Sequence, residues 1–161
     1  MRGFGILEIV IAVSIISATI FSLSFVFLIA SKLETMSLDK IRANFITEEG
    51  LEAMRFLRDQ SWSGNFLALA PGTTYFLSFS APDSSWSIGT SNPGLIDDLF
   101  LRKVTINNIS RDPSTQNIES TYNPSNDDPD TKKINVSVEW LERGSTASIT
   151  VSTYLSDIFD N

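Results

Sequence analysis

The feature that most constrains this chain is an apolar run from Phe4 to Ala30, interrupted by one charged residue, Glu8. An α-helix needs about 20 apolar residues to cross the hydrocarbon core of a bilayer, and this run is longer and contains no proline. A secretory signal normally has an apolar region of about 7–15 residues behind several basic ones, whereas only Arg2 precedes this run. The sequence therefore predicts a membrane-spanning helix at residues 4–30.

Glu8 is the unusual residue of that helix. A carboxylate inside the bilayer costs about 2.5–3.5 kcal/mol on insertion scales, so it usually has a partner group or a task. Glu8 also lies near one end of the apolar run, where its side chain could reach the lipid head groups at little cost. The residues alone leave both interpretations open.

The neighbours of Glu8 resemble a known processing motif. Gly3, Phe4 and Glu8, followed by a long apolar helix, stand in the order found in type IV prepilins and the related pseudopilins. In that family a dedicated peptidase cuts after the glycine and methylates the new amino terminus, which implies a leader at residues 1–3 and processing at Gly3 and Phe4. The resemblance also implies that Phe4 and Glu8 act in assembly. The carboxylate of one subunit would neutralise the terminal amine of a neighbour inside an apolar filament core.

The helix is expected to continue beyond the membrane as an amphipathic segment at residues 31–62. One face carries apolar or small residues at helical spacing, and acidic and basic residues cover much of the rest. We expect the charged face to be solvated, with contact between neighbouring subunits as the alternative. Gly64 and Asn65 should end the helix. The predicted buried stripe consists of Ile46, Gly50, Ala53, Met54 and Leu57.

Residues 63–161 alternate between apolar and polar side chains, which is typical of strands with one buried face. A bulge is expected near Arg102 and Lys103, because the apolar side of that strand changes there. The fold class is predicted to be α+β, with one long amino-terminal helix packed on a small antiparallel sheet, which is also the pilin-like fold that the resemblance implies. The predicted strands are Thr74–Phe79 and Ser85–Ile88, joined around Pro82-Asp83, then Leu99–Ile109, and finally Ile134–Trp140 and Ala147–Leu155, joined at Arg143-Gly144.

A long loop is predicted at residues 110–131, which contain three prolines and little apolar periodicity. Its later part is rich in oxygen donors, and some pseudopilins bind calcium in a loop near the carboxyl end. The bidentate acid and the glycine of an EF-hand loop are missing, so calcium is weighed against a plain solvated loop. The oxygen donors are Asn123, Asn126, Asp127, Asp128 and Asp130.

Composition limits the other function classes. The formal net charge of -7 disfavours a nucleic-acid partner, because such binders display a clustered basic face. The chain has no histidine and no cysteine, and it contains neither a nucleophile motif nor a phosphate-binding glycine loop. We therefore expect no catalytic residues, no metal and no cofactor.

Two functional classes remain. In the first, which the resemblance implies, the protein is a major pilin, minor pilin or pseudopilin. It would be a single-pass membrane protein with its head outside the cytoplasm, and then a subunit of a filament on the cell surface. Its partners would be other pilin subunits, the prepilin peptidase, an inner-membrane assembly platform and, before assembly, membrane lipid. In the second class the protein is a membrane-tethered extracellular ligand-binding module that does not polymerise, and Glu8 is merely interfacial.

Overall fold

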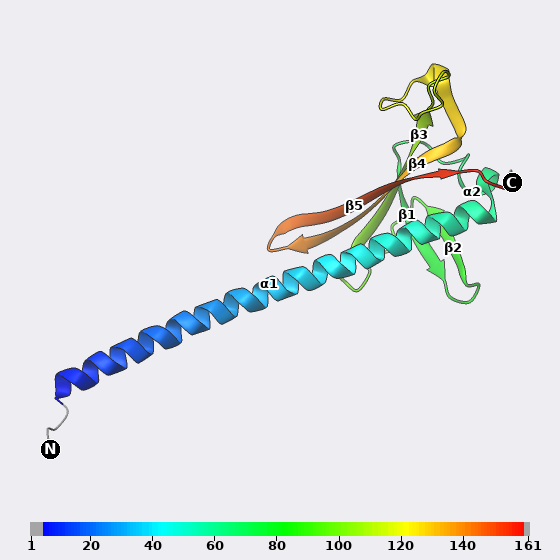
Figure 1. Cartoon of the computed structure of the whole chain (residues 1–161). Helices are drawn as coiled ribbons and strands as arrows, with labels where there is room; N and C mark the ends of the chain where they lie inside the picture. The colour runs from blue at the N-terminus through cyan, green and yellow to red at the C-terminus, as the bar shows by residue number, and fades with distance from the viewer. Residues whose placement is uncertain (1–4, 160–161) are drawn as a thin grey trace. The chain divides into compact units, whose positions relative to one another are not determined.

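The computed structural model describes residues 5–159, so the predicted processing site at Gly3 and Phe4 lies outside the described residues. The chain divides into two compact units, an amino-terminal unit (residues 1–40) and a carboxy-terminal unit (residues 41–161). Helix α1 (Ile6–Gln60) runs through both (Figure 1). The prediction of one uninterrupted helix is confirmed as far as Gln60. The predicted end is wrong, because α1 stops before residue 62, and Gly64 and Asn65, which were expected to end it, belong to the short helix α2 (Trp62–Asn65) that follows.

The carboxy-terminal unit contains a five-stranded sheet in the order β2-β1-β3-β4-β5, in which every neighbouring pair is antiparallel. Both predicted hairpins are present, β1 with β2 and β4 with β5 (Figure 1). Arg143 and Gly144, at the second turn, have φ angles of 53° and 80°, which is the left-handed geometry of a two-residue hairpin turn. The strands are β1 (Thr74–Ser80), β2 (Ser85–Gly89), β3 (Leu101–Ser110), β4 (Asp127–Glu142) and β5 (Ser145–Ser156).

The last five turns of α1 pack on one face of this sheet. The predicted stripe is confirmed, since all five of its residues are buried. It begins at Ala43, and no side chain between residues 31 and 42 is buried, so the first third of the predicted amphipathic segment has no internal partner. The main core joins residues of α1 and α2 to the inner face of the sheet: Ala53, Met54, Leu57, Trp62, Phe66, Tyr75, Leu77, Val104, Ile106, Ile134, Val136 and Leu155.

The prediction of a bulge near Arg102 and Lys103 is wrong. Arg102 is buried in the same alternation as Val104 and Ile106, and the register of β3 against β4 is regular there. The one register shift in β3 lies between Asn108 and Ile109. Arg102 stays on the core face because another element supplies partners for its charge.

The predicted loop at 110–131 is too long at its carboxyl side. β4 begins at Asp127, where Asp127 and Asp128 pair with Ser110 and Ile109. Lys132 pairs with Asn108, so residues 129–131 face no residue of β3, and Pro129 sits where no N–H is needed for that ladder. The connection between β3 and β4 is thus residues 111–126 (Figure 1). It contains the 3-10 helix η1 (Pro124–Asn126).

Candidate functional site

The largest surface feature is the apolar side of the amino-terminal unit. Large apolar side chains from Ile6 to Leu38 are exposed, among them Phe21 at 78% and Phe27 at 70%. Within residues 5–159, α1 is the one helix long and apolar enough to cross a membrane. Residues 6–30 rise about 37 Å at 1.5 Å per residue, which exceeds a hydrocarbon core of about 30 Å.

The apolar residues cover the whole circumference of the helix. Ile9, Val10 and Ile11 are consecutive and more than half exposed, and successive helical residues project about 100° apart. A helix that lies flat on a surface has one polar face, whereas a helix that is apolar all round must be surrounded by lipid or by other apolar segments. The amino-terminal unit is therefore built to be enclosed.

Glu8 lies in the first turn of α1, where a negative charge is favoured by the helix dipole. Its side chain is exposed among Ile6, Leu7 and Ile9, and within residues 5–159 its carboxylate has no ion-pair or hydrogen-bond partner. The other two predicted site residues, Gly3 and Phe4, lie outside the described residues. The structure thus places Glu8 at one end of the apolar surface and leaves its pairing with Phe4 a prediction.

Three of the five hydroxyl groups within the apolar run bond back to carbonyls of the helix. Ser14 donates to the carbonyl of Val10 at 2.7 Å, and Ser22 donates to that of Ala18 at 2.9 Å. Thr19 bonds back in the same way, to the carbonyl three residues earlier. These bonds leave few polar groups that need water, which suits an apolar surrounding.

Three of the five oxygen donors weighed for calcium accept hydrogen bonds within the protein, namely Asn123, Asp127 and Asp128. Asn123 accepts from the backbone N–H of Ser125 at 3.1 Å, and Asp127 accepts from the hydroxyl of Tyr122 at 2.9 Å. Within the described part of the chain, no three acidic side chains are grouped so that they could hold a metal ion. The arrangement favours a loop closed by its own hydrogen bonds.

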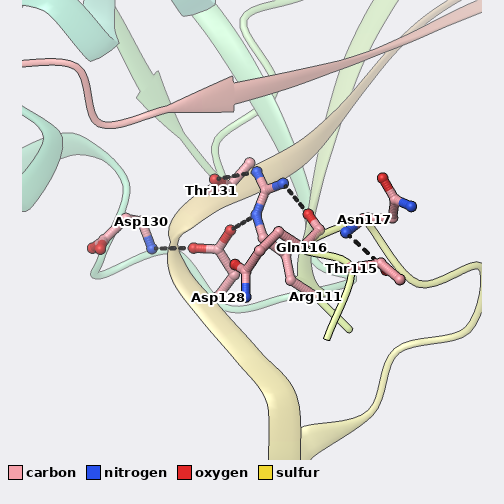
Figure 2. Close-up of polar contacts among 7 residues, drawn as sticks. All are labelled: Arg111, Thr115, Gln116, Asn117, Asp128, Asp130 and Thr131. Atoms are coloured by element: carbon pink, nitrogen blue, oxygen red, sulfur yellow. Dashed lines mark hydrogen bonds and ion pairs between the residues drawn. The ribbon is translucent and has the colours of Figure 1, made fainter. Parts of the chain in front are cut away.

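Arg111 is the centre of that closure (Figure 2). Its guanidinium donates to the carboxylate of Asp128 at 2.5 Å and to the carbonyl of Gln116 at 3.1 Å, and it reaches the hydroxyl of Thr131 at 3.4 Å. Partial burial of Asp128 raises its pKa, but hydrogen bonds from Arg111, Thr131 and the Asp130 N–H, with the Arg111 charge, outweigh this effect. The net result is a lowered pKa for Asp128. We call this group the Arg111 clasp.

A second ion pair, Arg102 with Glu49, joins β3 to α1 inside the carboxy-terminal unit. The Nη1 of Arg102 donates to Glu49 at 2.6 Å and to the Ile46 carbonyl at 3.3 Å. The guanidinium carbon lies 5.1 Å from the centre of the Trp86 ring, within range of a cation–π contact. Gly50 makes room for this side chain, because a Cβ there would lie 3.0 Å from the Arg102 Cδ.

A pocket of about 330 Å³ opens beside this pair. Its polar side is formed by Arg102 and Glu49, and its apolar side includes Phe79, Trp86 and Leu95. This site was not predicted from the sequence, because Glu49 was assigned to a solvated helix face and a bulge was expected at Arg102. The available signal was the position of Arg102, two residues before Val104 in a run of alternating buried residues.

Comparison with protein-family models, with curated proteins and with solved structures finds no match for this chain, so its function is argued from its own residues.

Proposed function

We propose that the protein is a structural subunit of an extracellular filament of the type IV pilus kind, with a pilin-like fold. The observation that carries the proposal is the segment of α1 at residues 6–30, which is apolar around its circumference and bears one carboxylate, Glu8, in its first turn. A single surface of this kind suits two environments, lipid before assembly and the packed helices of neighbouring subunits afterwards.

Glu8 gives the helix a means of fixing its alignment along neighbouring helices. Cleavage after Gly3 would leave an ammonium on Phe4, and in a filament core this group and the Glu8 carboxylate of a neighbour would each be costly alone. As a pair they offset much of that cost, and they do so only when adjacent helices are aligned. The resemblance at Gly3, Phe4 and Glu8, together with the exposed and unpartnered Glu8 carboxylate within residues 5–159, supports this role.

The first test is the intact mass, with amino-terminal fragmentation, of protein sheared from the native cell surface. We expect a chain that begins at methylated Phe4 and that is released by shearing. A chain that still begins at Met1 and stays in the membrane fraction would overturn the proposal. That result would favour a membrane-tethered binding module, which the pocket beside Arg102 and Glu49 also suits.

The second test is Glu8→Gln, which removes the charge and keeps the size of the side chain. We expect normal cleavage and membrane insertion, but at least a tenfold loss of sheared filament, because about 1.4 kcal/mol per contact corresponds to tenfold in an equilibrium constant. Glu34→Gln is the matched control, since Glu34 is an exposed acid of the same unit outside the apolar run. Filaments of Glu8→Gln in normal quantity would show that Glu8 has no role in assembly.

A further inference from the structure

The guanidinium of Arg102 has donors that the fold does not use. The side chain is 7% exposed, and its Nη1 makes both of its hydrogen bonds. Its Nε is buried without an acceptor, and within residues 5–159 Nη2 also makes no hydrogen bond. A buried donor without a partner costs about 1–3 kcal/mol, so native proteins rarely keep one unless water or a ligand completes it.

Arg102, whose Nη2 is one of these unused donors, lines the same pocket as an acceptor. Arg102 and Glu49 both line the cavity, and the Glu49 side chain is 53% exposed. The Nε and Nη2 hydrogens of an arginine point in parallel along one edge of the guanidinium and can hold one or two oxygens. The pocket can therefore donate through Arg102 and accept through Glu49.

The charge balance favours a neutral ligand. Arg102 and Glu49 neutralise each other at 2.6 Å, and the whole chain carries a net charge of -7. A carboxylate entering the pocket would meet an arginine that is already paired, close to the carboxylate of Glu49, in an acidic protein. A hydroxyl group both donates and accepts, so it can use Arg102 and Glu49 without adding charge.

A second wall of the pocket is aromatic and partly open to solvent. Phe79 and Trp86 are cross-strand neighbours in β1 and β2, with ring centres 5.1 Å apart and planes tilted by 51°. Phe79 is 54% exposed, an unusual position for a phenylalanine on the helix-facing side of the sheet. Aromatic faces carry negative charge density and attract the weakly positive C–H groups of a flat, partly apolar ring.

The third wall is held in place before any ligand arrives. Ile96 exchanges two backbone hydrogen bonds with Phe100, of 2.8 and 2.9 Å, and Phe100 is fully buried. These bonds fix the turn that places Leu95 and Ile96 on the pocket. The volume of about 330 Å³ is at the small end of the range of ligand pockets, about 300–1,000 Å³, which limits the occupant to roughly one sugar ring.

From these features we infer that the pocket between Arg102, Glu49 and Phe79 binds one ring of a neutral saccharide. Ring hydroxyls bond to the Arg102 guanidinium through Nη2 and to the Glu49 carboxylate, and one face of the ring packs on Phe79. The inference does not depend on the filament, because every residue involved belongs to the carboxy-terminal unit of a single chain.

The test uses the full chain in micelles of a zwitterionic detergent without a sugar head group. The probes are the methyl glycosides of glucose, galactose, mannose and N-acetylglucosamine, with glucuronate and benzoate as anionic probes, each up to about 100 mM so that millimolar affinity is detected. The readout is the indole N–H signal in NMR spectra. Trp86 lines the pocket, whereas Trp62 and Trp140 are buried in the cores and serve as internal references.

We expect at least one neutral glycoside to shift the Trp86 signal saturably. Phe79→Ala should weaken that binding by about tenfold, and Phe45→Ala, which removes an exposed phenylalanine of α1 that does not line the pocket, should leave it unchanged. Arg102→Lys, which keeps the charge but removes the parallel donors, should also weaken binding. The inference is overturned if no neutral glycoside shifts Trp86, if only the anionic probes do, or if Phe79→Ala binds as well as the unaltered chain.

Discussion

The two units of the chain use the same apolar residue types in opposite ways. In the carboxy-terminal unit Phe66 and Phe100 are 0% exposed, and helix and sheet bury each other's apolar faces. In the amino-terminal unit Phe21, Phe25 and Phe27 are at least 65% exposed. One unit buries its apolar side chains within its own chain, whereas the other leaves a helix long and apolar enough to cross a membrane exposed. The carboxy-terminal unit is stabilised by its own core, whereas the apolar side chains of the amino-terminal unit depend on the medium around them.

The largest expected effect comes from removing one phenylalanine ring from each unit. Phe100→Ala leaves a cavity against Trp140, whose ring lies 5.9 Å away, and should lower the free energy of unfolding of the carboxy-terminal unit by about 3–5 kcal/mol. Phe21→Ala deletes the same atoms from an exposed position and should change that free energy by less than about 0.5 kcal/mol. Urea unfolding in mild detergent, followed by near-ultraviolet circular dichroism, measures both.

The comparison between the units fails if the two variants unfold alike. A large effect of Phe21→Ala on unfolding would mean that the amino-terminal unit contributes to the core of the other unit. A small effect of Phe100→Ala would mean that its surroundings collapse into the cavity. If the protein forms the proposed filament, filament yield provides the complementary measurement, since Phe21→Ala should lower it although the fold is intact.

An intermediate effect is expected at Gly50, where α1 and the sheet lie close together. A Cβ at this position would lie 2.8 Å from the Cγ1 of Val136, which is fully buried and stiff at χ1. Gly50→Ala should therefore destabilise the carboxy-terminal unit by about 1–2 kcal/mol, after a gain of up to about 1 kcal/mol from helix propensity. Gly89→Ala is the control, since a Cβ there meets nothing within 4 Å. A stabilised Gly50→Ala protein would show that the sheet can shift away from the helix.

The sequence predicted most of what depends on apolar periodicity. The helical stripe from Ile46 to Leu57 and the alternation of β4 appear in the structure as expected, because in both the pattern and the burial have the same physical cause. The membrane-length helix could equally be predicted from the sequence, since length and hydropathy alone define it.

The errors lie where a distant partner overrides the local pattern. Arg102 remains on the core face because Glu49, 53 residues earlier, accepts its hydrogen bond, and a strand viewed alone does not show this. Asp127 and Asp128 have low strand propensity, yet they extend β4 because Ser110 and Ile109 offer a ladder and Arg111 neutralises Asp128. The pocket beside Arg102 follows from the same pairing, and the alternation of β3 could indicate only that Arg102 faces the core, not which residue accepts its hydrogen bond.

The smallest expected effect concerns the Arg111 clasp, where the carboxy-terminal unit relies on charge rather than on apolar burial. Asp128→Asn removes the ion pair and should lower stability by about 1 kcal/mol at neutral pH. Asp130→Asn makes the same change of charge two residues away, at a side chain that takes no part in the clasp, and should have almost no effect. Urea unfolding of both variants and the unaltered chain at about pH 7 provides the comparison.

Acid should remove the difference between the unaltered protein and Asp128→Asn. The pKa of Asp128 lies below its ordinary value of 3.8, so the folded state binds this proton less readily than the unfolded state does. The contribution is therefore fully present above the unfolded pKa and is lost as the pH falls through the lower folded pKa, that is, below about pH 4. If Asp128→Asn is as stable as the unaltered chain at pH 7, the clasp only positions the 111–126 loop. If the difference persists at about pH 2, it arises from lost packing rather than from charge.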